Sequence, residues 1–152
     1  MQTRIYVASS WRNTHQARIV ELLRTIPNCD VYDFRAPEPG NSGFHWSQIE
    51  PDWRSMTVPR FREVLDSELA DTSYRHDMGA LNQCNLCVLV MPCGRSAHLE
   101  LGFARGAGKR TAVYYPPKVE IDPELMYKMC HLITGDDDEL VAWVKNEMLL
   151  IG

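Results

Sequence analysis

Long hydrophobic runs are absent from this sequence: no apolar stretch approaches the roughly 20 residues that a bilayer-spanning helix needs. The first residues also lack the apolar core of a signal peptide. Lysine and arginine are not clustered, and the formal net charge is −4, which argues against a nucleic-acid-binding surface. We therefore expect neither a membrane nor a nucleic acid among the partners of this chain.

Cysteine and histidine are present, but without the spacing that is typical of metal ligands. The five cysteines are an odd number and are scattered along the chain, which favours reduced thiols and a cytoplasmic location over a disulfide framework. Cys84 and Cys87 form a CxxC pair with no second half, and the five histidines show no paired spacing. We expect no metal and no other cofactor.

The size and pattern of the sequence predict one domain that covers residues 1–152. A chain of this length buries roughly 70% of its unfolded surface, and short apolar runs alternate with segments of helical apolar spacing. Such alternation implies a parallel sheet covered on both faces. We therefore expect a Rossmann-like or flavodoxin-like three-layer α/β fold with a five-stranded parallel sheet. The expected strands are 4–8, 30–34, 86–91, 111–115 and 130–133; the expected helices start after a Thr14 cap, at Pro59 (running through Leu69), near 77, near 97 and at 136.

One strand, turn and helix in the middle of the chain suggest an anion site. The apolar run 86–91 leads through Gly94, Arg95 and Ser96 into a helix that carries Glu100 one turn from its start. Free N–H groups and the positive end of the helix dipole meet at such a point, and arginine and serine side chains suit a phosphate. Glu100 is then a candidate catalytic carboxylate, or an acid that only stabilises the helix dipole.

Two further polar clusters are expected at the same edge of the sheet, where the carboxyl ends of parallel strands form ligand sites. The first follows the first strand and contains Ser9, Ser10 and Arg12; the second is His76 with Asp77. Taken alone, Asp77 is more typical of a solvated helix residue or a cap.

Aromatic residues supply the remaining candidates. Tyr6 either points from the first strand into the cleft or belongs to the core. Residues 35–58 form a long loop with Trp46 and Trp53, and loops of this length are commonly lids or binding loops. Each tryptophan either stacks on a flat ring or pins the loop to the core.

Three segments resemble the nucleoside 2-deoxyribosyltransferase-like family, which includes the 2′-deoxynucleoside 5′-phosphate N-hydrolases. They are residues 5–12 (IYVASSWR), residues 76–88 (HDMGALNQCNLCV) and residues 96–104 (SAHLELGFA). The last segment is the most specific. The resemblance implies an enzyme that cleaves or exchanges the N-glycosidic bond of a nucleoside or nucleotide, a small-molecule partner.

The same resemblance implies a role for each candidate residue. Glu100 would be the nucleophile that attacks the sugar C1′, Asp77 the acid that assists the leaving base, and Tyr6 the residue that positions Glu100. Ser10, Arg12 and Ser96 would hold the 5′ end of the substrate. This chemistry is coherent, because an adjacent carboxylate stabilises or traps the oxocarbenium-like centre, and two neighbouring carboxyl groups favour keeping one proton between them.

Two departures from the family pattern qualify this interpretation. Asn85 stands where many members carry aspartate, and Gly94-Arg95-Ser96 replaces a stretch that often holds another acid in enzymes acting on free nucleosides. The second departure favours a nucleoside 5′-monophosphate as substrate. Hydrolase and transferase remain alternatives, as do a nucleotide sensor without turnover and a structural protein with a vestigial cleft.

The family resemblance also implies a homo-oligomer in which a neighbouring copy completes each pocket. Residues after Pro117, including Met126 and Tyr127, are the candidates for that contact.

Overall fold

The computed structural model describes all residues, 1–152, and the chain divides into two compact units. Residues 1–33 and 81–152 form the first, which we call the sheet unit, and residues 34–80 form the second, which we call the intervening unit. The expectation of one domain over the whole chain stays a prediction. None of the helices is both long enough and apolar enough to cross a membrane.

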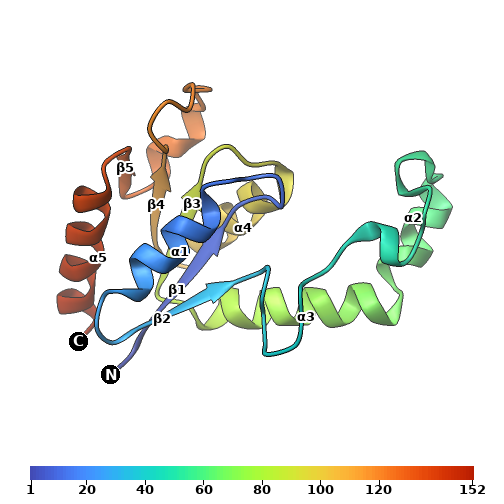
Figure 1. The fold of residues 1–152 in the computed structure, drawn as a ribbon, viewed down its shortest axis with the longest axis horizontal. Helices are drawn as coiled ribbons and strands as arrows, with labels where there is room; N and C mark the ends of the chain where they lie inside the picture. Colours follow the sequence, from blue (N-terminus) through green and yellow to red (C-terminus); the bar gives the residue numbers. More distant parts are fainter. The chain divides into compact units, whose positions relative to one another are not determined.

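The sheet unit is built on five parallel strands in the order β2-β1-β3-β4-β5 (Figure 1). This confirms the predicted fold class and all five strands, with boundaries that shift by one or two residues. The strand β3 is buried along its whole length, as expected for the centre of a covered parallel sheet. The strands are β1 (Thr3–Ala8), β2 (Cys29–Asp33), β3 (Leu86–Val90), β4 (Arg110–Tyr114) and β5 (Leu132–Thr134).

Helices cover both faces of this sheet, which gives the three layers (Figure 1). The helices α1 (Gln16–Arg24) and α5 (Asp137–Ile151) pack on one face, where Ile19 and Leu140 join a core with Ile5, Val7 and Val88. The helix α4 (Arg95–Gly106) packs on β3, β4 and β1. Alternate residues of each strand therefore face different helices, as the pleat of a strand requires.

The helix starts follow local capping chemistry, with two corrections to the sequence-based expectations. The last helix starts within one residue of the expected position: Asp136 is the N-cap of α5 and accepts a hydrogen bond from the Glu139 amide. Thr14 does not cap α1: the Asn13 side chain accepts from the first amides of that helix instead. Arg95 and Ser96, expected in a turn, are the first two residues of α4, because Gly94 is its N-cap.

The intervening unit consists of a long connection, two helical segments and an aromatic cluster. The prediction of a single helix from Pro59 through Leu69 is wrong. The helix α2 (Val58–Leu65) ends four residues before Leu69, and a second helix, α3 (Glu68–Gln83), starts after it. The Ser67 hydroxyl separates α2 from α3, because it donates a hydrogen bond to the Val64 carbonyl at 2.6 Å. The connection contains two short 3₁₀ helices, η1 (Trp46–Gln48) and η2 (Trp53–Ser55).

Candidate functional site

The carboxyl ends of β1 and β3 lie next to each other at the point where the strand order reverses. β1 pairs with β3 so that Ala8 is opposite Leu89, while the strand that follows β1 in the chain, β2, lies on its other side. In open parallel sheets this switch point is where ligands bind. The two loops that leave it are the β1–α1 loop, residues 9–15, and the β3–α4 turn, residues 91–94.

Side chains of the first loop bind these two segments together. The Ser9 hydroxyl donates to the Val90 carbonyl at 2.9 Å. The side-chain Nδ2 of Asn13 donates to the same carbonyl at 3.1 Å and to the carbonyl of Pro92 at 2.9 Å. Ser9, predicted to bind substrate, therefore uses its proton within the protein and offers a ligand only its oxygen lone pairs.

Asn13 is the important residue that the sequence-based reading missed. It is only 2% exposed, and its Oδ1 accepts hydrogen bonds from the amides of His15 and Gln16 at 2.7 and 2.9 Å. The signal was present, because asparagine followed three residues later by glutamine is a helix-start pattern. Its bonds to Val90 and Pro92, by contrast, depend on the tertiary structure.

The first turn of α4 presents a second set of polar groups at the same edge. Gly94, the N-cap, supplies no side-chain acceptor, so no cap bond occupies the first amides of the helix. Arg95 and Ser96 are exposed there, and Arg12 is exposed on the neighbouring loop. Two guanidinium groups and a helix N-terminus with no side-chain cap are what an anionic group requires.

Glu100 lies in the second turn of α4, next to the buried residue Leu101. Glu100 itself is half-buried. Its negative charge contributes to the raised pKa of two cysteine thiols. Burial raises the pKa of Cys93 to about 12, and the negative charge of Glu100 adds to this effect. The pKa of Cys87, inside β3, is raised chiefly by burial and also by Glu100. The Cys93 thiol therefore stays protonated, which excludes an activated thiolate beside the carboxylate.

Tyr6 lies in the middle of β1 rather than at its end. It is fully buried, and its ring stacks on that of Tyr32 with 5.2 Å between the ring centres. The expectation that Tyr6 belongs to the core is therefore met, and its proposed role beside Glu100 stays a prediction.

The remaining predicted site residues belong to the intervening unit. Trp46 packs edge-on against Phe44, with ring centres 4.9 Å apart, and lies 5.8 Å from the Phe61 ring. These contacts pin the long connection in place within its own unit. On α3, Asp77 is half-buried, and His76 Nε2 lies 4.0 Å from a Glu38 carboxylate oxygen.

Asn85 has the structural role that its place before β3 suggests. Its Oδ1 accepts a hydrogen bond from the Arg4 amide at 2.9 Å, and its carbonyl accepts one from the Arg110 amide at 3.2 Å. It therefore joins the entrances of β1, β3 and β4.

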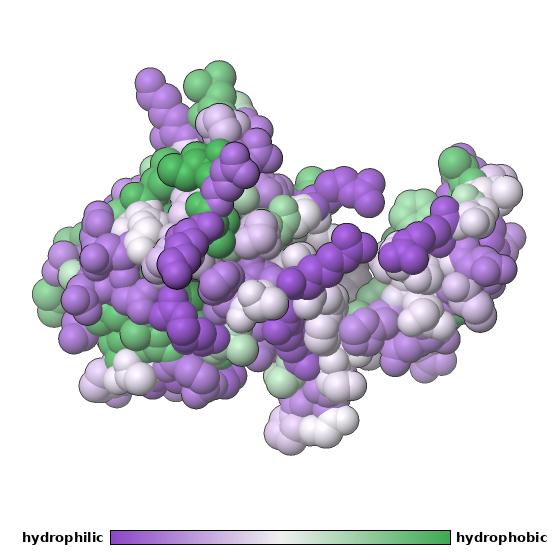
Figure 2. Space-filling model, turned by 45° about the horizontal axis from the view of Figure 1, so that its top comes forward, coloured by the Kyte–Doolittle hydropathy of each residue, from purple (hydrophilic) through white to green (hydrophobic).

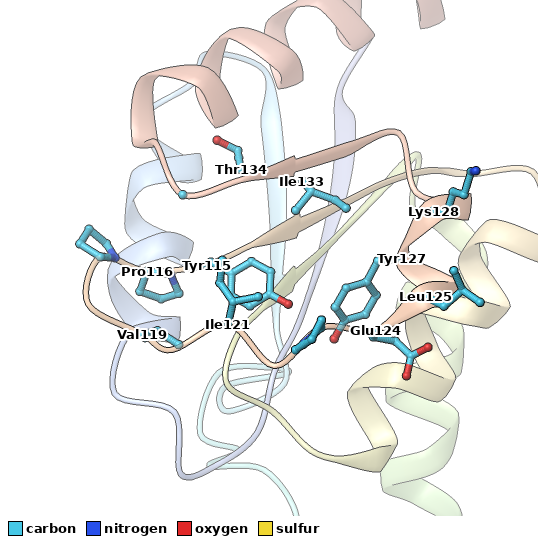
Figure 3. Close-up of a pocket in the computed structure, with 13 residues that line it drawn as sticks. Tyr115, Pro116, Val119, Ile121, Glu124, Leu125, Tyr127, Lys128, Ile133 and Thr134 are labelled. Carbon is cyan, nitrogen blue, oxygen red and sulfur yellow. The ribbon is translucent and has the colours of Figure 1, made fainter.

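A hollow of about 760 Å³ opens beside the ends of β4 and β5, bordered by Tyr115, Tyr127 and Ile133 among others (Figure 3). Tyr127 is only 6% exposed, which leaves little of its surface for a neighbouring copy, and its contact with a second copy stays a prediction. Met126 beside it is 59% exposed, and its contact with a second copy stays a prediction. Hydrophobic residues interrupt an otherwise largely hydrophilic surface on this part of the molecule (Figure 2).

No set of three or more histidine, cysteine, aspartate or glutamate side chains in the structure is placed to hold a metal ion.

Comparison with known proteins gives a match in structure but not in sequence. No family model matches the chain, and no curated protein matches it by sequence.

Three solved structures share the fold across most of their length. A 2-deoxyribosyltransferase from the psychrotolerant bacterium Bacillus psychrosaccharolyticus is 17% identical, with a TM-score of 0.62 over 91% of this chain and 90% of that one. A conserved protein from Enterococcus faecalis is 15% identical, with a TM-score of 0.59 over 96% and 99% of the two chains. The Clostridium botulinum CMP N-glycosidase BcmB is 14% identical, with a TM-score of 0.50 over 94% and 99%. The resemblance to the deoxyribosyltransferase-like proteins is thereby confirmed at the level of fold.

Proposed function

We propose that this protein cleaves or exchanges the N-glycosidic bond of a nucleoside 5′-monophosphate, with Glu100 as the nucleophile. The observation that supports the proposal is a half-buried carboxylate, Glu100, a little more than one turn from the N-terminus of α4, the helix that follows β3 at the switch point. Two of the solved structures with this fold are a 2-deoxyribosyltransferase and a CMP N-glycosidase, which supports the same class of reaction here.

The reaction is a double displacement at the sugar C1′. A carboxylate oxygen of Glu100 forms a bond to C1′ as the bond from C1′ to the base nitrogen breaks, and the departing base takes a proton from Asp77. Water or a second base then displaces Glu100 from C1′ and returns a proton to the Asp77 carboxylate. The choice between these two acceptors separates hydrolase from transferase. Tyr6 positions Glu100, the role that the resemblance implies for it.

The 5′-phosphate is bound by the loops at the end of β1 and β3. Arg12 and Arg95 supply charge, Ser10 and Ser96 supply hydroxyl groups, and Gly94 leaves the first amides of α4 accessible. Ser9, whose hydroxyl already donates to Val90, is not one of these donors. An acidic side chain in place of these cations would repel a phosphate. The cations at this edge of the sheet unit therefore favour a nucleotide over a free nucleoside.

The test is release of free base from a panel of ribo- and deoxyribonucleoside 5′-monophosphates and the matching nucleosides, followed by liquid chromatography. We expect release from at least one monophosphate, and a loss of at least about a thousandfold in Glu100→Gln because the covalent route is removed. Asp77→Asn should slow substrates with poor leaving bases most. Glu21→Gln is the matched control, since Glu21 is exposed and pairs only with Arg24.

Two results would contradict the enzyme interpretation. One is a wild-type protein that releases no base and exchanges none. The other is Glu100→Gln with unchanged turnover. If a monophosphate raises the melting temperature and is recovered intact, the protein is a nucleotide sensor instead.

A further inference from the structure

His98 forms hydrogen bonds with both of its ring nitrogens, and these bonds fix its tautomer. Nδ1 lies 2.7 Å from the carbonyl oxygen of Gly94, and Nε2 lies 2.6 Å from the Tyr127 hydroxyl. A carbonyl only accepts, so Nδ1 carries the proton of the neutral ring. Nε2 is then the acceptor at 2.6 Å for the Tyr127 hydroxyl, which also lies 3.4 Å from the Met91 sulfur, a weaker acceptor.

The bond to Gly94 acts on the peptide group that opens α4. In a trans peptide the carbonyl and the following N–H point in opposite directions. The hydrogen bond from His98 keeps the Gly94 carbonyl pointing toward the body of α4. The Arg95 N–H of the same peptide group then points the opposite way, toward the space in front of the α4 N-terminus. That amide is one of those with no side-chain acceptor.

Tyr127 holds the His98 ring in the orientation that this requires. It comes from η3 (Leu125–Met129), and its ring stacks on that of His98 with centres 5.7 Å apart and 14° between the planes. The residue is 6% exposed. Burial raises the pKa of Tyr127 well above its usual value, so the hydroxyl keeps the proton that it donates. The ring also borders the hollow of Figure 3.

We propose that His98 and Tyr127 are positioning residues that aim the Gly94–Arg95 peptide at the substrate phosphate, a role that rests on the proposed function. Neither residue touches the substrate. The chain of bonds runs from η3 through the two rings to the Gly94 carbonyl and ends at the Arg95 amide. Segment 115–131 thereby acts on phosphate binding from within the same chain.

The variant that tests this is Tyr127→Phe, which removes only the hydroxyl and keeps the stacked ring. Its control is Tyr114→Phe, the same chemical change on β4, where the hydroxyl bonds Asp137 and Arg18 and does not contact α4. Both variants lose a hydrogen bond and should lose thermal stability. Only Tyr127→Phe should weaken the binding of inorganic phosphate and of a nucleoside 5′-monophosphate, by roughly fivefold, the factor expected for one hydrogen bond.

The decisive readout is the ratio of kcat/KM for a monophosphate to kcat/KM for its nucleoside. This ratio should fall roughly fivefold in Tyr127→Phe and stay constant in Tyr114→Phe. A residue that only supported the fold would lower both rate constants together. His98→Phe, which keeps a ring but has no ring nitrogen, should lower the ratio as well, and adding Tyr127→Phe to it should have no further effect.

A nitrogen-15 spectrum of the His98 ring gives a second readout that needs no turnover. We expect the Nδ1–H tautomer in the wild type, and finding the Nε2–H tautomer overturns the inference. So does an unchanged affinity for phosphate in Tyr127→Phe, or a wild type that binds no phosphate at all. A wild type that binds phosphate, loses affinity in Tyr127→Phe and yet releases no base supports the inference and refutes the proposed activity.

Discussion

Replacing Asn13 tests how the two loops of the candidate site are held together. Its side chain, 2% exposed, donates to the carbonyls of Val90 and Pro92 and accepts from the amides of His15 and Gln16. Every hydrogen-bonding capacity of the amide is thus used. One residue therefore caps α1 and joins the β1–α1 loop to the β3–α4 turn.

The cost of Asn13→Ala can be estimated from these bonds. Loss of the cap costs about 1 kcal/mol. Loss of the two donated bonds costs roughly 1 kcal/mol each, although the Val90 carbonyl keeps its bond from Ser9. The expected loss in the free energy of unfolding is about 3 kcal/mol, which corresponds to a fall of about 6–12 °C in melting temperature for a chain of this size.

Asn13→Asp separates the cap from the loop contacts. The carboxylate still accepts from the α1 amides, but an oxygen replaces Nδ2 and faces the carbonyls of Val90 and Pro92. We expect a loss of stability at pH 7 that diminishes toward pH 4, where an aspartate begins to take up a proton and can donate again. Urea unfolding at several pH values measures this. Asn146→Ala, on the exposed face of α5, is the control. A cost below about 1 kcal/mol for Asn13→Ala would refute the estimate.

Two further predictions concern stability away from the site. Glu147 is 6% exposed and accepts two hydrogen bonds from Arg110, whose side chain is 42% exposed. Arg110→Met leaves a buried carboxylate without its partner and should lower the free energy of unfolding by about 3 kcal/mol. Glu147→Gln leaves a cation that can turn to water, so its loss should be smaller. Equal losses in urea unfolding would contradict this. His131 Nδ1 accepts from the Thr111 amide at 3.0 Å, and burial lowers the His131 pKa below its usual value. Its contribution is complete above about pH 6.5 and is lost as the pH falls toward the lowered pKa. In His131→Asn, the asparagine Oδ1 takes the place of Nδ1 and does not titrate. The stability of this variant relative to the wild type should therefore rise below pH 6.5. Parallel curves of unfolding free energy against pH for the two proteins would count against the reasoning.

Much of the fold was predictable because its signals are local. The β3 run is buried throughout and was recognised from its apolar residues alone, and α5 starts within one residue of the expected position. The errors are local as well. Thr14 was preferred to Asn13 as a cap, and the break at Ser67 was missed, because competing start signals lie within a few residues of each other.

The candidate site was predictable only in part. The resemblance in residues 96–104 marked Glu100, but the sequence does not reveal that its charge acts on the thiols of Cys87 and Cys93. The bond between His98 and Tyr127 joins residues 29 positions apart. No periodicity or motif predicts such a pair.

By itself, the sequence determined which segments become strands and helices, where several helices start and that the strands run parallel, since burial patterns and capping groups act over a few residues. The tertiary structure decided that β1 and β3 are neighbours, that Ser9 and Asn13 meet Val90, and that Tyr127 reaches His98. Strand order and packing bring together groups that are far apart in the chain. Their contacts depend on the combined burial of the whole core rather than on any one segment.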